Sequence, residues 1–190
     1  MLYKTGIAGS YLLCGLVSAR VFYTQFNFYV PGLIFIAVTV VMALISNPAI
    51  KLKSIAIYCV LSYILYFGVF FLTMQCGSLG IFTGIFLSGA GAYLVFWLTN
   101  KFLIPVNFKS GWIFWLGALS FSLNVTLMFE PASHFVKPVY DIAHASKDLK
   151  YFDLNIRFAP SFLFWQLSVG TKLGLEIFKN RDTRHISMTR

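Results

Sequence analysis

Six long apolar blocks fill most of this 190-residue chain, and nearly all of its charged residues lie between them. Only 11% of the residues are charged, whereas 58% are hydrophobic and 18% are aromatic. Soluble domains carry about 25% charged residues, so a water-soluble fold of this size could not hide so much apolar surface. Each block approaches the roughly 20 apolar residues that cross the hydrocarbon core of a bilayer. The pattern therefore predicts an integral membrane protein.

The blocks leave room for little besides membrane-spanning helices. We expect an all-helical membrane protein in which a single domain, residues 1–190, forms one bundle of about six transmembrane helices. Pro31 suits the start of the second helix, because the first turn makes no use of its missing N–H. The expected spans are residues 5–23, 31–47, 54–73, 77–99, 112–129 and 156–178. An extracytoplasmic loop (residues 130–155) and a basic cytoplasmic tail (residues 179–190) complete the chain.

The lysines and arginines predict the orientation of the bundle. If the N-terminus lies inside, the inner segments contain Lys4, Lys51, Lys53, Lys101, Lys109, Lys179, Arg181, Arg184 and Arg190. The outer segments then contain Arg20, Lys137, Lys147, Lys150 and Arg157. Short cytoplasmic segments are enriched in basic residues, so we expect both termini in the cytoplasm and the chain in a bacterial inner membrane or a plasma membrane.

The same distribution accounts for the net charge of +9. In a soluble protein that charge would indicate nucleic acid, but here it lies in the short loops and the tail, as in polytopic membrane proteins. We therefore expect the lipid bilayer as a partner and no nucleic acid. Cys14, Cys59 and Cys76 are isolated in the sequence and predict neither a disulfide framework nor a metal-binding pair. No cofactor is expected.

Small residues recur at helical spacing in three of the blocks, and in the first span they are Gly6, Ser10, Cys14 and Ser18. The expected helix-packing residues are Gly80, Gly84, Ser88 and Ala92 in the fourth span and Gly170 and Gly174 in the sixth. Small side chains allow two helix backbones to approach closely, which is how helices associate in lipid. This pattern predicts packing within the bundle or, alternatively, a face for a membrane protein partner or for a second copy of the chain.

A few polar residues interrupt the apolar spans. Asn124 and Thr126 in the fifth span, and Gln166 and Lys172 in the sixth, are the candidate ligand-binding residues. Each uncharged polar group needs a hydrogen-bond partner in the bilayer, which either joins two helices or lines a cavity for a solute. Lys172 lies one helical turn before Glu176, so the two charges are expected to neutralise each other.

The loop over residues 130–155 is amphipathic at helical spacing. Its polar face contains Glu130, His134, Lys137, Asp141, His144 and Asp148, and its apolar face contains Phe135, Val139, Ile142 and Leu149. This pattern predicts an interfacial helix between the fifth and sixth spans, which Pro138 would kink. Asp141, His144 and Asp148 are weak candidates for a metal site, because no known metal motif has this spacing and a solvated face explains it equally well.

The chain contains no catalytic signature. Ser88-Gly89 resembles part of the GxSG motif that rhomboid proteases carry on their fourth span, but Phe86 replaces the first glycine and the sixth span contains no histidine. Without a neighbouring base a serine hydroxyl is a poor nucleophile. No catalytic residue is therefore predicted, and an enzyme is the less favoured class.

Three functional hypotheses remain from the sequence. The first is a non-enzymatic multi-pass membrane subunit that packs against partner membrane proteins. The second is a small-solute or vitamin transport component with a polar cavity between the fifth and sixth helices. In size and topology the chain resembles the substrate-binding subunits of energy-coupling-factor transporters, although no shared motif supports this. The third is a lipid-facing membrane enzyme that uses the loop over residues 130–155.

Overall fold

The protein is helical throughout the part of the chain that can be described. The computed structural model describes residues 2–25, 29–75, 81–106, 111–129 and 163–188, and none of these residues lies in a strand. The helices are α1 (Leu2–Gln25), α2 (Tyr29–Ser46), α3 (Leu52–Gln75), α4 (Ile81–Phe102), α5 (Trp112–Phe129), the π-helical turn η2 (Gln166–Gly170) and α8 (Thr171–Met188). The prediction of an all-helical fold is confirmed for these residues.

Among the described residues, three helices are long and apolar enough to cross a membrane. They contain the segments Tyr29–Ser46, Leu52–Leu72 and Phe82–Phe102, whose mean hydropathies are 2.3, 2.3 and 1.5. A shorter apolar segment, Trp112–Ser122, lies within α5. The chain therefore has the character of a membrane protein. The predicted interfacial helix falls within residues 130–155, which lie outside the described residues.

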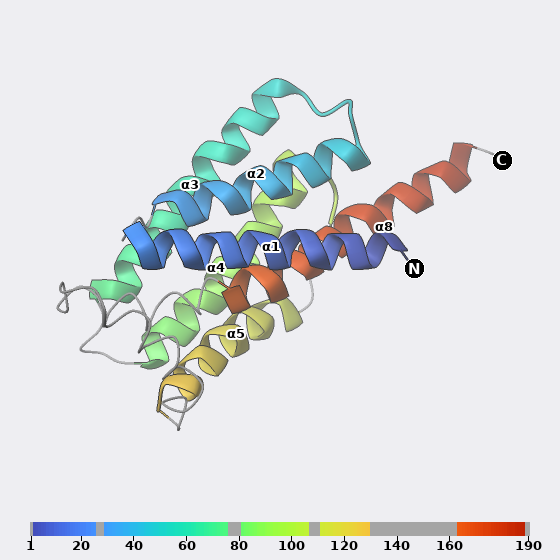
Figure 1. The fold of residues 1–190 in the computed structure, drawn as a ribbon. Coiled ribbons are helices and arrows are strands. Elements are labelled where there is room, and N and C mark those ends of the chain that lie inside the picture. Colours follow the sequence, from blue (N-terminus) through green and yellow to red (C-terminus); the bar gives the residue numbers. More distant parts are fainter. Residues whose placement is uncertain (1, 26–28, 76–80, 107–110, 130–162, 189–190) are drawn as a thin grey trace.

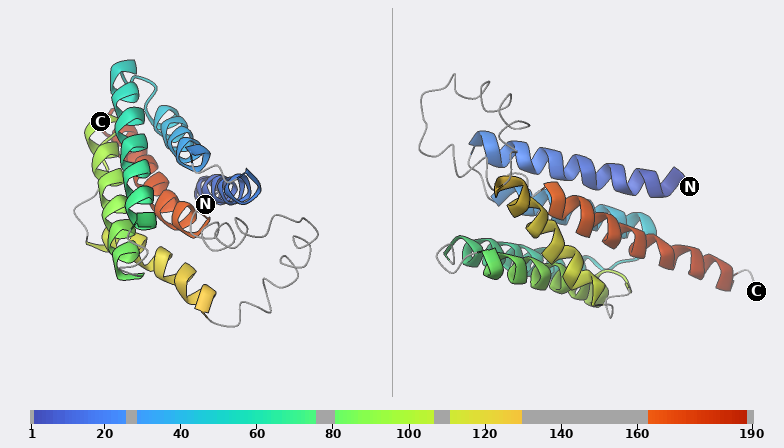
Figure 2. Two further views of the ribbon diagram at one scale, coloured as in Figure 1. Left: turned by 90° about the vertical axis from the view of Figure 1, so that its left-hand side faces the viewer. Right: turned by 90° about the horizontal axis from the view of Figure 1, so that it is seen from below.

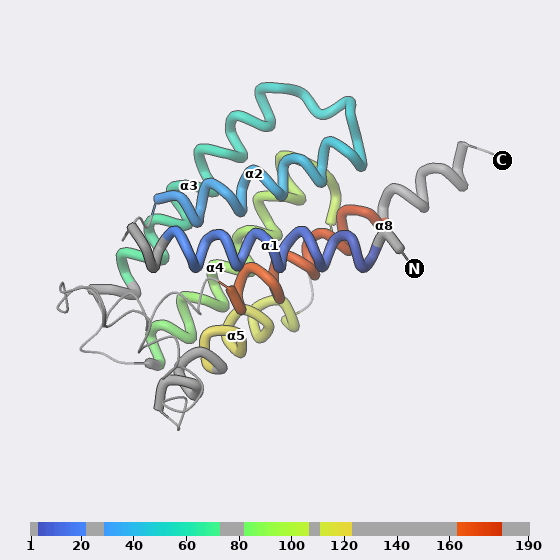
Figure 3. Tube along the Cα trace, in the orientation of Figure 1, coloured from blue at the N-terminus to red at the C-terminus, as the bar shows by residue number. Residues whose placement is uncertain are grey.

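The helices run back and forth between two ends of the molecule (Figure 1). The trace in Figure 3 shows α1 and α2 running in opposite directions, as do α3 and α4. Both termini lie at one end, together with the α2–α3 turn, and the right-hand view of Figure 2 shows the same placement of the termini. The most extensive helix pair is α4 with α5, followed by α1 with α2 and α3 with α4.

The connections at this end follow from local chemistry. Proline has no backbone N–H and cannot continue a helix, so α2 ends two residues before Pro48. The side-chain Oδ1 of Asn47 then accepts a hydrogen bond from the N–H of Ala49 (3.3 Å). At the end of α4, Oδ1 of Asn100 accepts a hydrogen bond from the N–H of Val106 (3.0 Å). Asparagine side chains thus complete both turns.

The described residues form two apolar clusters in the interior. The larger joins α1, α2, α4, α5, η2 and α8, with Tyr11, Phe35, Phe96, Val169 and Leu173 among its members. The smaller joins α2, α3 and α4; its members are Ile36, Ala43, Tyr58, Leu98 and Leu103. Helices α2 and α4 contribute to both clusters, so these two helices link the interior of the described part of the bundle.

Candidate functional site

The π-helical turn η2 is the most unusual local feature of the bundle. It spans Gln166–Gly170, where one extra residue is accommodated per turn before the chain continues into α8. π-helical turns are rare and occur frequently at functional sites. The turn places the Gln166 side chain in the interior, where it is buried. This segment is therefore the starting point for a candidate site.

Gln166 joins three helical segments through its side-chain amide. The thiol of Cys14 in α1 donates a hydrogen bond to Oε1 of Gln166 (3.2 Å). Nε2 of Gln166 donates to the backbone carbonyl of Pro31 in α2 (3.1 Å). An amide buried in apolar surroundings is costly unless it is hydrogen-bonded, and here both of its ends have a partner. The polar group therefore fixes α1 and α2 against the π-helical turn.

Four hydroxyl groups form a second polar layer in the interior. The hydroxyl of Tyr11 lies 3.1 Å from Oγ1 of Thr39, which joins α1 to α2. Oγ1 of Thr99 lies 3.3 Å from the hydroxyl of Tyr58, which joins α4 to α3. Each threonine also donates within its own helix, Thr39 to the carbonyl of Phe35 and Thr99 to that of Val95. All four hydroxyl-bearing residues are fully buried.

Serines connect α4, α5 and η2. The hydroxyl of Ser88 donates a hydrogen bond to the carbonyl of Gly117 (2.8 Å), and Nε1 of Trp165 donates to the carbonyl of Ser88 (3.3 Å). The hydroxyls of Ser120 and Ser168 are hydrogen-bonded to each other. Because the Ser88 proton is donated to a backbone carbonyl, this serine has the environment of a packing residue rather than of an activated nucleophile.

The small residues of α4 lie against α5. A Cβ added to Gly84 would come within 2.5 Å of Cε1 of Phe121, and one added to Gly117 within 2.6 Å of Cβ of Ala92. Ser88 belongs to the same contact through its bond to Gly117. Gly80 lies outside the described residues. Small residues therefore allow α4 and α5 to approach closely.

The glycines at the start of the C-terminal helical segment, Gly170 in η2 and Gly174 in α8, lie against α1. A Cβ at Gly170 would overlap the ring of Tyr11, and one at Gly174 would come within 2.5 Å of Cγ2 of Ile7. Tyr11 in turn packs beside Phe35 with a ring-centroid distance of 5.8 Å. The Tyr11 hydroxyl can reach Thr39 because Gly170 leaves room for the ring.

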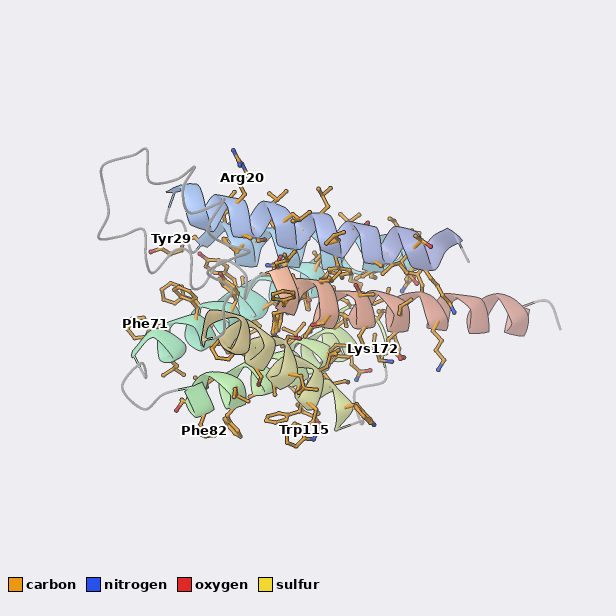
Figure 4. All side chains as sticks on the ribbon, turned by 60° about the horizontal axis from the view of Figure 1, so that its bottom comes forward. Arg20, Tyr29, Phe71, Phe82, Trp115 and Lys172 are labelled. Atoms are coloured by element: carbon orange, nitrogen blue, oxygen red, sulfur yellow. The ribbon has the colours of Figure 1, made fainter. Side chains whose placement is uncertain are left out.

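The ion pair expected between Lys172 and Glu176 is confirmed. Nζ of Lys172 lies 2.8 Å from Oε1 of Glu176, and the two side chains are 46% and 10% exposed. Figure 4 places Lys172 toward the end that holds the termini, away from Arg20, Tyr29, Phe71 and Phe82. Lys172 therefore extends outward and neutralises a nearly buried carboxylate.

Other candidate residues are not brought into this site by the described structure. Asn124 and Thr126 belong to α5, but their side chains lie outside what is described. Asp141, His144 and Asp148 fall within residues 130–162, also outside it. Among the described residues, no group of three His, Cys, Asp or Glu side chains could hold a metal ion.

Sequence reasoning missed most of the polar interior. It selected Gln166 but not its partners Cys14 and Pro31, and it overlooked Thr39 and Thr99. The signal that selected Asn124 and Gln166, a polar residue deep in an apolar run, applies equally to these two threonines. Tyr11 and Tyr58 carry no such signal, because tyrosine is common at both lipid-facing and buried positions.

Comparisons with known proteins found no match to this chain among protein-family models, curated proteins or solved structures.

Proposed function

We propose that this chain is a non-enzymatic, multi-pass membrane subunit that packs against a partner membrane protein. In this proposal six helices cross the bilayer, and both termini lie in the cytoplasm. The common end of the termini and the α2–α3 turn supports that topology, because Lys4, Lys51 and Lys53 then lie on the same side.

The main support for a partner is the outward face of α1. Gly6 and Gly9 are exposed there, and an added Cβ at either position would meet no atom within 4 Å. Leu13, Leu16 and Arg20 are exposed on the same helical face. A glycine inside a helix costs about 0.5–1 kcal/mol relative to alanine. Neither glycine is needed for packing inside the described bundle, so close approach of a helix from another protein would offset that cost.

The inward direction of the polar groups also supports a structural role. Gln166 donates and accepts within the bundle, and the hydroxyls of Ser88, Ser120 and Ser168 are bonded to other helices or to one another. Glu176 is paired with Lys172. These polar contacts are all made within the chain itself, as in a bundle whose interior serves packing.

Photo-crosslinking in native membranes tests this proposal with a matched control. A photoreactive phenylalanine would replace Leu13 on α1 or Ile64 on α3, which are 63% and 61% exposed. We expect a defined protein adduct at position 13 and only lipid adducts at position 64. Equal adducts at both positions, or protein adducts at neither, would contradict a partner on α1. The adduct mass distinguishes another protein from a second copy of this 21.5 kDa chain.

A small-solute transport component is the second candidate, and the polar interior favours it. The π-helical turn, the Gln166 amide and the buried Tyr11–Thr39 pair lie in neighbouring helices. In a transporter these contacts would break and re-form as the interior opens to water. In a packing subunit they would stay closed.

Reactivity of Cys14 separates the two candidates. In a Cys59→Ser, Cys76→Ser background, a small charged thiol reagent would be applied to the protein in bilayers. Cys14 is buried and bonded to Gln166, so a packing subunit protects it until the fold is lost. Modification of Cys14 in the folded protein would favour the transport function instead.

A further inference from the structure

At the end of the bundle that holds the termini, three of the exposed lysines lie beside helix connections. Lys51 and Lys53 flank the start of α3, and Lys101 lies in the last turn of α4. We call these three residues the lysine rim. Lys51 and Lys53 lie at the α2–α3 connection, which Figure 1 shows at the end that holds the termini, and Lys101 lies just before the α4–α5 connection. All three side chains are exposed.

The smaller apolar cluster holds the two parts of the rim together. Ile50 and Ile55, on either side of Lys51 and Lys53, pack against the same cluster as Trp97 and Phe102 of α4. Lys101 lies between those two aromatic residues in the sequence. The residues that flank the three lysines therefore pack against the same apolar cluster, which fixes the start of α3 and the end of α4 relative to each other.

The charge of the rim is not neutralised within the described part of the chain. None of its lysines forms an ion pair with a described carboxylate, and Glu176 pairs with Lys172. The first turn of α3 contains no acidic residue. The positive end of the α3 dipole therefore adds to the charges of Lys51 and Lys53 instead of offsetting them.

Aromatic contacts indicate the depth of the rim in a bilayer. Nζ of Lys101 lies 4.7 Å from the ring centroid of Trp97 and 5.4 Å from that of Phe102. Tryptophan is enriched where the acyl chains meet the headgroups. Leu52, between the two other lysines, is 80% exposed. An exposed apolar side chain flanked by cations suits a surface where acyl chains and phosphates meet.

We propose that the lysine rim binds the anionic headgroups of the bilayer leaflet at this end. The partner is a phospholipid with a net negative charge, because its phosphate pairs with the lysines while its acyl chains contact Leu52 and the outer faces of α3 and α4. This inference goes beyond the proposed function and requires only that the chain spans the membrane. A positive-inside topology alone predicts no preference between anionic and zwitterionic lipid around the protein.

Lipid selectivity in bilayers tests the inference. The full chain would be reconstituted into phosphatidylcholine with either brominated phosphatidylglycerol or brominated phosphatidylcholine, and tryptophan quenching would give the relative affinity for the two lipids. A lysine near an anionic surface contributes about fivefold to binding. We expect phosphatidylglycerol to be preferred and the preference to decrease with salt. The variant K51Q/K53Q/K101Q should lose it.

Two controls make the result specific. The charge-conserving variant K51R/K53R/K101R should keep the preference, and Arg20→Gln, at the opposite end of the bundle, should leave it unchanged. Equal quenching by the two lipids in the parent protein, or an unchanged preference in the triple glutamine variant, would overturn the inference. Flotation with the vesicles after alkaline extraction is measured first, and protein that fails to float would contradict the membrane placement itself.

Discussion

Helices α3 and α4 lie side by side and are both apolar, yet they occupy opposite environments. The best membrane-spanning window of α3 has a mean hydropathy of 2.3 and is only 11% buried inside the bundle, whereas that of α4 has a mean hydropathy of 1.5 and is 50% buried. The less apolar helix is thus the more central one. In lipid there is no hydrophobic drive between helices, so hydropathy predicts insertion into the membrane and not burial within the protein.

The difference in burial between α3 and α4 depends on where each helix has small residues in close contact with a neighbour. In α4, Gly84 and Gly89 lie against Phe121 and Phe114 of α5. In α3, an added Cβ at Gly68 would meet nothing within 4 Å, and large side chains such as Val60 and Ile64 are exposed. Close backbone approach, rather than apolar surface, therefore brings α4 into the centre.

The largest loss of stability is expected from a substitution at Tyr58, which anchors α3 in the bundle. Tyr58 is fully buried in the smaller apolar cluster, whereas Ile64 is exposed on the same helix. Tyr58→Ala should lower the free energy of unfolding by about 2–3 kcal/mol, because it removes a buried aromatic ring and its hydroxyl contact. Ile64→Ala should change it little. Unfolding with a denaturing detergent measures both; equal losses would show that α3 is not anchored through Tyr58.

The next largest difference in stability is expected between alanine substitutions at two glycines, Gly117 in α5 and Gly68 in α3. Gly117→Ala places a methyl group 2.5 Å from the carbonyl oxygen of Ser88, a backbone atom that cannot move aside without shifting α4. We expect a loss of about 1–3 kcal/mol from overpacking. Gly68→Ala in α3 meets open space and should be neutral or gain about 0.5–1 kcal/mol from helix propensity. Thermal unfolding of the two variants compares them, and similar shifts would contradict the close approach of α4 and α5.

The smallest effect concerns the contact between the hydroxyls of Tyr58 in α3 and Thr99 in α4. Tyr58→Phe and Thr99→Val each remove one side of the 3.3 Å contact. A double-mutant cycle should give a coupling of about 0.6 kcal/mol, typical of interhelical hydrogen bonds in membranes. The pair Ser10→Ala and Thr99→Val serves as a control, because Ser10 bonds within α1 to the carbonyl of Gly6. Additive losses for Tyr58 and Thr99 would show that the contact does not hold α3 to α4.

Sequence reasoning reached further into the fold than into the candidate site. Apolar blocks bounded by prolines and asparagines predict helices that end near Asn47-Pro48, and α2 ends at Ser46. The spacing of Lys172 and Glu176 predicts their ion pair, because residues four apart on a helix are neighbours. Both features depend on local order along the chain. The π-helical turn has no such signal in Gln166–Gly170, whose residues would fit an ordinary helix.

The sequence by itself determined that the described chain is helical and apolar enough for a membrane, because hydropathy and helix spacing are properties of neighbouring residues. Tertiary structure alone decided which polar groups meet. Cys14 and Gln166 are separated by 152 positions in the chain, and their contact exists only once α1, α2 and η2 have assembled. It likewise decided that the small residues of α4 contact α5 while Gly6 and Gly9 of α1 remain exposed. The small residues of α1 and α4 look alike in the sequence. Only the assembled bundle determines which of them are covered by a neighbouring helix.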